Sequence, residues 1–156
     1  MIQVEIPGYG TLEAHSLVLD FNGTLACGGR LMDGLKELIA TLAGRISIYV
    51  VTADTFGSVE AEVKDMAVEL VKLGAGRERL DKLALVRRLG PDTTVSIGNG
   101  NNDVLMLKES VLGICVMGHE GCAKAAMDQA DLVIGDIRSA LELLIWPDRL
   151  KATLRY

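Results

Sequence analysis

The sequence predicts an α/β fold: a mostly parallel sheet with helices on both faces, in three Rossmann-like layers. Short β-rich apolar runs alternate along the chain with segments of helical periodicity, which is the pattern of repeated βα units. One of these runs, residues 46–51 (ISIYVV), is almost entirely apolar, as expected of a strand buried on both faces of a parallel sheet. The first fifteen residues differ, because two alternating runs flank a Pro-Gly-Tyr-Gly turn and predict an antiparallel hairpin.

Length and composition limit the class of protein. A chain of 156 residues has the size of one domain, so we expect residues 1–156 to form a single domain. Hydrophobic residues make up 49% of the chain but aromatic residues only 4%, so the core must be aliphatic. The net charge of −5, without a basic stretch, argues against a nucleic-acid partner. The sequence has neither an apolar run of ~18 residues nor a signal peptide, so we expect a cytoplasmic protein without a membrane partner.

The N-terminal half begins with the hairpin, which we expect at the edge of the sheet. Each later helix is predicted from apolar residues that recur on one helical face, with a glycine after two of them, Gly44 and Gly90. In order, the expected elements are hairpin strands 2–6 and 11–15, a strand at 16–19, a helix at 32–43, a strand at 46–51, a helix capped by Ser58, a weak strand at 68–71 and a helix at 80–89.

The C-terminal half repeats the alternation with shorter elements. A Gly-rich loop follows its first strand, and Pro147 is expected to end its last helix. The expected strands are 94–97, 112–116 and 132–134, and the expected helices are 102–110, 121–129 and 137–145. The three cysteines, Cys27, Cys115 and Cys122, form no paired cluster, which predicts neither a disulfide framework nor a zinc site and suits a reducing cytosol.

Polar residues are concentrated where the predicted strands end. Asp20 ends the first core strand, Thr52 follows the second, Lys82 opens a helix, and Asp103 closes the Gly-rich loop after the fourth strand. Because ligands of open α/β sheets bind at the carboxyl ends of the strands, we expect these groups at one rim. A carboxylate there can attack phosphorus, while Mg²⁺, hydroxyl, amine and backbone N–H groups neutralise the phosphoryl oxygens. The sequence therefore predicts phosphoryl transfer to a carboxylate.

These motifs resemble those of the haloacid dehalogenase superfamily, and most closely the phosphorylation domain of P-type ATPases and its small soluble relatives. The segment Asp20-Phe21-Asn22-Gly23-Thr24 matches the first motif of that family, and Gly98-Asn99-Gly100-Asn101-Asn102-Asp103 matches the fourth. The resemblance implies an Mg²⁺-dependent phosphotransferase or phosphatase that forms an aspartyl phosphate on Asp20. It implies catalytic roles for Asp20, Asn22, Thr52 and Lys82, phosphate binding by Gly23, Thr52, Ala53 and Lys82, and metal binding by Asp20, Asn22, Asn99 and Asp103.

Two positions depart from the family pattern. Phosphatases of the family carry an aspartate where this chain has Asn22, and an amide cannot donate or accept a proton near neutral pH. The family also usually has a metal-binding aspartate at the position of Asn99, whose amide oxygen can bind Mg²⁺ only without charge. We therefore expect weak acid–base catalysis and weaker metal binding than usual.

The spacing of the motifs leaves no room for an inserted cap domain. Asp20 and Thr52 are separated by 32 positions, and Thr52 and Lys82 by 30, which the βα units already use. Only a short flap at residues 26–30 fits after the first motif. A capless, open site of this family implies a phosphorylated substrate of unknown identity and a possible homo-oligomer.

Two other functions compete with the enzyme. Asn22 and Asn99 are compatible with a non-catalytic regulatory protein that keeps the fold and binds phosphate or metal. A receiver domain also orders Asp, Thr and Lys along a parallel sheet, but it needs an acidic pair near its first strand, which is absent before Asp20. The retained Asp20, Thr52, Lys82 and Asp103 favour the enzyme.

Overall fold

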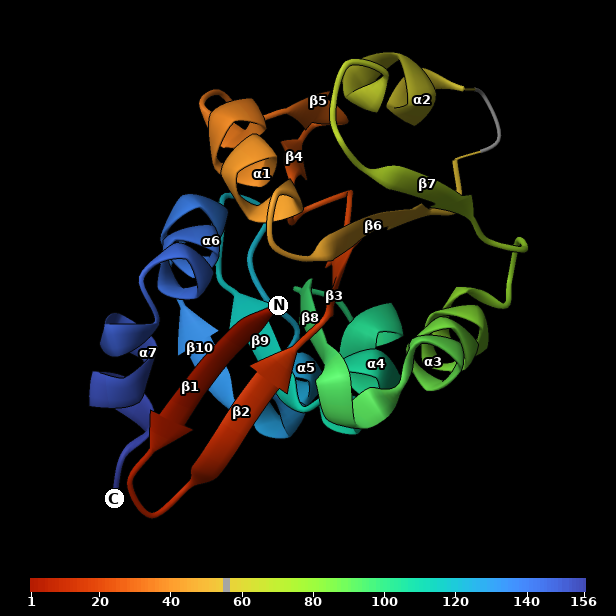
Figure 1. Cartoon of the computed structure of the whole chain (residues 1–156). Coiled ribbons are helices and arrows are strands. Elements are labelled where there is room, and N and C mark those ends of the chain that lie inside the picture. Colours follow the sequence, from red (N-terminus) through yellow and green to blue (C-terminus); the bar gives the residue numbers. More distant parts are fainter. Residues whose placement is uncertain (55–56) are drawn as a thin grey trace.

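The structure, a computed structural model that describes residues 1–54 and 57–156, is built on a six-stranded parallel sheet (Figure 1). The strand order across the sheet is β10-β9-β8-β3-β6-β7. The strands are β3 (Ser16–Asp20), β6 (Ser47–Thr52), β7 (Glu69–Lys72), β8 (Thr94–Gly98), β9 (Leu112–Val116) and β10 (Leu132–Ile134). Every neighbouring pair in this sheet is parallel, so the predicted fold class is confirmed.

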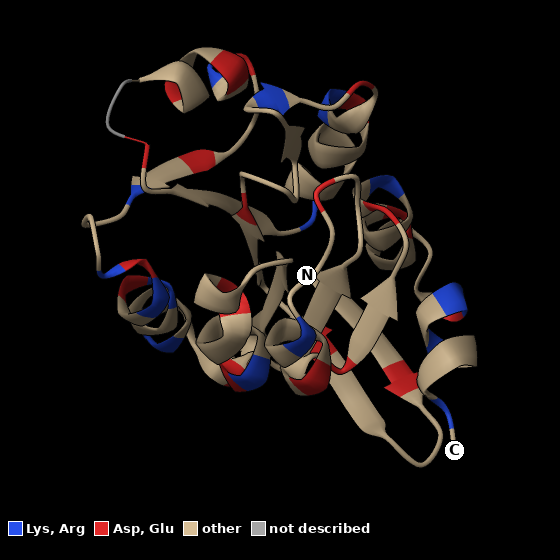
Figure 2. Ribbon diagram, turned by 180° about the vertical axis from the view of Figure 1, so that it is seen from behind, with Lys and Arg blue, Asp and Glu red and all other residues tan. Residues whose placement is uncertain are grey.

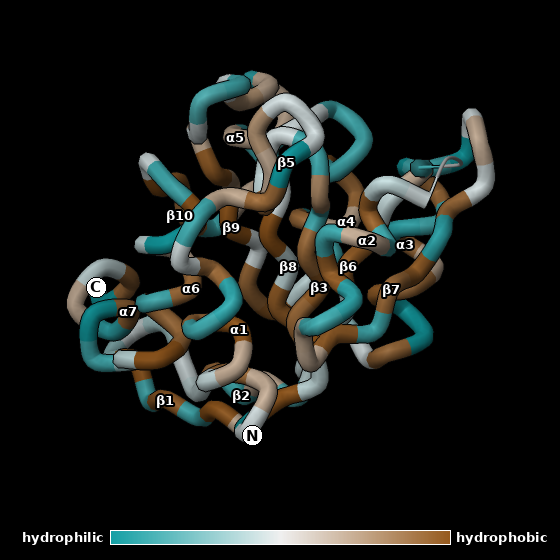
Figure 3. The backbone as a smooth tube through the Cα atoms, turned by 90° about the horizontal axis from the view of Figure 1, so that it is seen from above, coloured by the Kyte–Doolittle hydropathy of each residue, from teal (hydrophilic) through white to brown (hydrophobic). Residues whose placement is uncertain are grey.

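Helices cover both faces of the sheet. Successive residues of the central strand point to opposite faces, and each face is apolar and packs against helices. Leu17 and Leu19 pack into the core shared with α1 (Leu35–Ala43), α2 (Ser58–Val63) and α6 (Ile137–Ile145). Val18 packs on the other face with residues of α3 (Glu78–Leu89) and α4 (Val104–Glu109), beside which lies α5 (Lys124–Gln129). Figure 3 shows hydrophobic strands at the centre, and in Figure 2 charged residues of both signs are interspersed along the surrounding helices.

The N-terminal hairpin exists, but its predicted place at the edge of the sheet is wrong. Strands β1 (Ile2–Ile6) and β2 (Gly10–Ala14) pair only with each other as a separate antiparallel sheet. The reason is covalent: only His15 separates β2 from β3, and β3 lies in the middle of the large sheet. The hairpin therefore lies at the amino ends of the strands, where the backbone of His15 bonds to Thr93 and Ser47.

Proline 147 begins a helix that the sequence analysis missed. The helix α6 ends at Ile145, as expected, but α7 (Pro147–Leu154) starts immediately afterwards and packs against β1. Proline is well suited to the first turn of a helix, where its missing N–H has no partner to lose. Two short 3₁₀ turns, Pro91–Thr93 and Asn101–Asp103, precede β8 and α4.

The predicted flap is present as a small antiparallel pair, β4 (Ala26–Cys27) and β5 (Arg30–Leu31). The flap extends further than predicted, because the Met32 N–H donates to the Leu25 carbonyl, so α1 begins at Leu35 rather than at Met32. Gly34 precedes that helix with a φ of 76°, a conformation that favours glycine.

The cysteines also differ from expectation. Cys115 in β9 forms a disulfide with Cys122, which lies in the loop before α5, while Cys27 is free and exposed. The sequence separation of seven residues does not indicate a disulfide, because the bond forms only when the loop after β9 folds back toward the strand. Among the described helices, none has both the length and the apolar character needed to cross a membrane.

Candidate active site

The candidate active site lies where the strand order changes direction. β3 is flanked by β6 on one side and by β8 on the other, and the chain continues outward from both neighbours. Open α/β sheets bind ligands in the crevice at the carboxyl ends of such strands. Asp20 ends β3, Thr52 ends β6 and Gly98 ends β8, so the topology brings three predicted motifs to one crevice.

A buried ion cluster lies at this edge of the sheet. The Lys82 ammonium donates to Oδ1 of Asp20 and to Oδ1 of Asp103, at 2.6 Å in each case. The three residues are 1%, 7% and 0% exposed, respectively. Lys82 reaches the cluster from the second turn of α3, which begins two residues earlier than predicted.

The cluster contains one cation and two carboxylates. Burial, and then the negative charge of Asp103, raises the pKa of Asp20 to about 7, against the opposing charge of Lys82. Burial also disfavours the charged form of Lys82, but the two carboxylates outweigh this and raise the pKa of its ammonium above the ordinary value. The metal-free cluster therefore has one negative charge too many for its buried position.

Asp103 holds the Gly-rich loop in place. Its Oδ2 accepts hydrogen bonds from the backbone N–H groups of Asn99 and Gly100, both at 2.9 Å. A Cβ on Gly98 would lie 2.5 Å from the Asp103 Cγ, so only glycine fits at the start of the loop. Both carboxylate oxygens of Asp103 thus already have partners, which makes it an organiser of Lys82 and of the loop.

Oxygen atoms from two motifs converge beside Asp20. The Thr24 hydroxyl lies 3.2 Å from Oδ2 of Asp20 and 3.3 Å from Oδ1 of Asn99. The sequence places Thr24 in the first motif but does not indicate this role, because the contact with Asn99 spans 75 positions. The Asn99 amide nitrogen donates to the Gly121 carbonyl, which fixes the direction of its oxygen.

These groups fit a hard divalent cation. Within residues 1–54 and 57–156, no three His, Cys, Asp or Glu side chains are grouped as a metal site. The donors here are instead carboxylate and amide oxygens, which suit Mg²⁺, and the surplus negative charge of the cluster favours a cation.

Two other predicted residues line a cavity, and a third is buried at the end of β6. Asn22 and Ala53 line a cavity of about 330 Å³ together with Gly29 and Ser58. The buried Thr52 hydroxyl accepts from the Asp54 N–H, which leaves its own proton to donate.

Ser58 has a different local role from the one expected, and Gly23 has a conformational role besides the predicted one. The Gly23 N–H already donates to the Ala26 carbonyl, and a Cβ at its φ of 79° would lie 2.5 Å from the Asn99 amide nitrogen, so the structure gives Gly23 a conformational role. Ser58 lies inside α2 rather than capping it. The Asp54 carboxylate accepts from the Ser58 hydroxyl and the Val59 N–H in its place.

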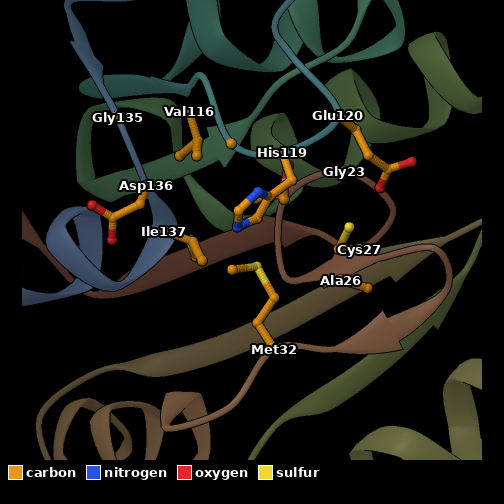
Figure 4. Close-up of a pocket in the computed structure, with 12 residues that line it drawn as sticks. Gly23, Ala26, Cys27, Met32, Val116, His119, Glu120, Gly135, Asp136 and Ile137 are labelled. Carbon is orange, nitrogen blue, oxygen red and sulfur yellow. The ribbon is translucent and has the colours of Figure 1, made fainter.

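A second cavity of about 230 Å³ lies behind the first motif (Figure 4). Met32, Val116 and Ile137 contribute apolar side chains to its lining, and the His119 imidazole projects into it from the loop after β9. Asp136 stands at its edge, where its carboxylate accepts from the Ser139 N–H and caps α6. This cavity was not predicted, because its walls come from three loops that are distant in the sequence.

Comparison with known protein sequences gives relatives of two kinds. No family model matches the chain. The uncharacterised protein MJ0073 of Methanocaldococcus jannaschii is 44% identical over 84 residues, which cover 51% of this chain and 90% of that protein. A soluble P-type ATPase-like phosphatase of the same organism is 26% identical over 142 residues, 87% of this chain, and the match spans only 51% of that relative.

Solved structures share the whole architecture at low sequence identity. A putative hydrolase of haloacid dehalogenase subfamily III A from Legionella pneumophila superposes with a TM-score of 0.72 at 18% identity, covering 92% of this chain and 87% of that one. The 3-deoxy-D-manno-octulosonate 8-phosphate phosphatase of Moraxella catarrhalis, solved with a magnesium ion, a phosphate ion and a KDO molecule, gives a TM-score of 0.68 at 17% identity over 92% and 95% of the two chains. The chain therefore has the fold of the haloacid dehalogenase superfamily, without a cap domain, and belongs to one family with MJ0073.

Proposed function

We propose that this protein is an Mg²⁺-dependent phosphatase or phosphotransferase that works through an aspartyl phosphate on Asp20. The observation that carries the proposal is the position of Asp20: a buried carboxylate at the switch point of the sheet, bonded to Lys82 and next to the oxygens of Thr24 and Asn99. A salt bridge that only stabilised the fold would not need these converging oxygens or an adjacent cavity.

In the proposed reaction, a carboxylate oxygen of Asp20 attacks the phosphorus of a phosphate ester. The new bond joins this oxygen to phosphorus, and the bond from phosphorus to the leaving oxygen breaks. The Thr52 hydroxyl, the Ala53 backbone and the Lys82 ammonium bind the phosphoryl oxygens, and Asn22 stands beside them at the cavity. Asp20, Asn22, Asn99 and Asp103 would hold Mg²⁺, which would neutralise phosphoryl charge, and Asp103 also organises the loop.

Asn22 determines how the reaction ends. An amide has no proton to give, so the leaving oxygen must take its proton from water, and good leaving groups should react best. The same residue cannot activate the water that hydrolyses the aspartyl phosphate. We therefore propose a phosphoenzyme that persists longer than in phosphatases with an aspartate at this position.

The substrate we propose is a small phosphorylated molecule that reaches Asp20 through the cavity beside Asn22. The solved structures that share the fold include a 3-deoxy-D-manno-octulosonate 8-phosphate phosphatase, which is compatible with a small polyol phosphate as substrate. We further propose a cytoplasmic protein without a nucleic-acid or membrane partner, in which a second copy of the chain could cover the open crevice.

The alternative is a non-catalytic protein that keeps the fold and binds phosphate or metal. Asn22 and Asn99 favour it, because each removes an ionisable group from a family motif. It predicts binding of Mg²⁺ or phosphate without any covalent adduct on Asp20.

The two functions can be separated by trapping the adduct. The protein is incubated with Mg²⁺ and acetyl phosphate or p-nitrophenyl phosphate, and an added mass of one phosphoryl group that hydroxylamine removes is sought by mass spectrometry. We expect the adduct in the wild type and in Asp65→Asn, an exposed control, but not in Asp20→Asn. Substantial turnover by a folded Asp20→Asn protein would exclude the covalent mechanism, and no adduct with any acyl or aryl phosphate would favour the non-catalytic alternative.

A further inference from the structure

The disulfide lies beside Gly98–Asp103, the loop to which the proposed function assigns metal binding. Cys115 is the sheet partner of Gly98, the residue directly before Asn99. Cys122 lies between two residues that both bond to Asn99: the Gly121 carbonyl accepts from the Asn99 amide at 3.1 Å, and the Ala123 N–H donates to the Asn99 carbonyl at 2.8 Å. Asn99 is thus linked to both ends of the disulfide-bonded segment, through Gly98 and Cys115 at one end and through its hydrogen bonds beside Cys122 at the other.

We propose that the disulfide between Cys115 and Cys122 is a reversible thiol switch that positions Asn99, and this inference rests on the metal-binding role of Asn99 in the proposed function. In the oxidised form the loop at residues 117–123 is fixed at both ends, so the Asn99 side chain is held with its oxygen toward Thr24. In the reduced form only hydrogen bonds hold the loop. The oxygen of Asn99 is then free to turn away from Asp20, and Mg²⁺ binds less tightly.

The burial of the two sulfurs determines how the switch opens. Cys115 is fully buried, whereas Cys122 is partly exposed in the loop. The thiolate of a dithiol reductant therefore attacks the Cys122 sulfur, and Cys115 leaves as a thiolate and is protonated. The second thiol of the reductant then attacks the mixed disulfide, so that two electrons and two protons reach the protein and the reductant becomes a cyclic disulfide.

The same loop forms a wall of the second cavity, so reduction of the disulfide would also loosen that wall. His119 and Glu120 of this loop line the cavity together with Ala26 and Cys27 of the flap (Figure 4). Disulfides in a reducing compartment are usually transient and redox-sensing, which matches a bond placed beside a catalytic loop rather than between distant elements. The free thiol of Cys27 is not part of the bond and offers a control.

The first test counts thiols. Protein purified without reductant is denatured and alkylated with iodoacetamide, either directly or after reduction, and its mass is measured by mass spectrometry. We expect one alkylated cysteine before reduction, which is Cys27, and three after it. Three reactive thiols after mild oxidation with oxidised glutathione would overturn the proposal.

The second test measures Mg²⁺ binding by calorimetry in a Cys27→Ser background, oxidised and after dithiothreitol. We expect the Kd for Mg²⁺ to be three- to tenfold higher after reduction and to recover on reoxidation. The Cys122→Ser variant should have the Kd of the reduced form, with or without dithiothreitol. Cys27→Ser alone should leave the Kd unchanged. An equal Kd in the two redox states would overturn the proposal.

A third measurement separates failure of the switch from failure of the proposed function. Hydrogen exchange of the Ala123 amide, which bonds to Asn99, should become faster on reduction, whether or not metal binds. Absence of Mg²⁺ binding in both states would refute the proposed function, and the exchange rates would then decide alone whether the disulfide positions Asn99. Unchanged exchange in that case would overturn the proposal as well.

Discussion

The Lys82 ammonium lies 2.6 Å from Oδ1 of Asp20, although 62 positions separate the two residues in the sequence. Both side chains are buried, and the same ammonium holds Asp103 at an equal distance. Stability and chemistry therefore depend on the same three charges. We therefore expect the free energy of unfolding to be lower without Lys82 than with it, and lower at high pH than at low pH.

Removal of the Lys82 charge should destabilise the fold strongly. In Lys82→Met, Asp20 and Asp103 remain buried side by side without a cation, which costs about 3–5 kcal/mol in comparable broken ion pairs. The free energy of unfolding in urea measures the loss, and this loss should become smaller toward acid pH, where the Asp20 carboxylate takes up a proton. The control is Lys72→Met, which breaks an exposed pair with Glu60 and should cost less than about 1 kcal/mol. Similar losses in both variants would contradict the role of the cluster.

The metal-free protein should lose stability as the pH rises from about 4 to about 7. The pKa of Asp20 is raised from 3.8 to about 7 by burial, so the folded state holds a proton that the unfolded state has released. The contribution of this carboxyl is complete below pH 4 and is lost as the pH passes through 7. Unfolding in urea with EDTA, compared between the wild type and Asp20→Asn, isolates it. Parallel pH profiles for the two proteins would show that Asp20 ionises normally.

Asn22→Asp should speed the decay of the phosphoenzyme. The new carboxyl can donate a proton to the leaving oxygen and later activate water, and such groups typically contribute ~10²–10⁴-fold in rate. Single-turnover decay of labelled phosphoenzyme measures the lifetime, and alkyl phosphates should gain more than aryl phosphates. If both proteins fold, bind Mg²⁺ and show the same lifetime, then Asn22 does not limit hydrolysis.

Asn99→Asp should tighten Mg²⁺ binding but weaken the metal-free protein. The charged oxygen is a better ligand, yet the replaced nitrogen donates to the Gly121 carbonyl, and a carboxylate there would face another acceptor. We therefore expect a lower Kd for Mg²⁺ by calorimetry and a lower Tm in EDTA. An unchanged Kd would place this side chain away from the ion.

Gly113→Ala should be the most damaging single-methyl change in the sheet. A Cβ at this position would overlap the Leu107 carbonyl oxygen of α4, so the helix or the strand must move, at a cost of about 1–3 kcal/mol or more. Gly44→Ala is the control, because the nearest atom to its Cβ would be the Thr41 oxygen at 3.6 Å. Urea denaturation of the two variants should give clearly different midpoints, and equal midpoints would mean that α4 shifts freely.

The parts of the site that follow from local patterns were predictable. Asp20 and Thr52 end strands, and strand ends can be read from apolar runs followed by polar residues, so their meeting at one rim needed only the rule for parallel sheets. Lys82 could be placed at the same rim because the helix that carries it belongs to the same alternation of strands and helices. The fold class rests on the same local signals.

The parts that depend on contacts between distant segments were not predictable. The hairpin was placed at an edge because the sequence does not state that β3 is central, and the partner of Cys115 depends on how one loop folds back. The conformational role of Gly23 is a further example, because its N–H bonds to Ala26 and its missing side chain makes room for Asn99. Each of these depends on packing between elements rather than on a repeating pattern.

The central position of β3 affects the order in which the chain can assemble during synthesis. Ser16 of this strand pairs with Ser47 on one side and with Thr94 on the other, so one flank of the strand that carries the nucleophile stays open until β8 has left the ribosome. During that interval the apolar side chains of β3 and its unpaired backbone are available to other nascent chains. Early collapse of the N-terminal half is therefore the step of biosynthesis at which we expect this protein to depend most on chaperones.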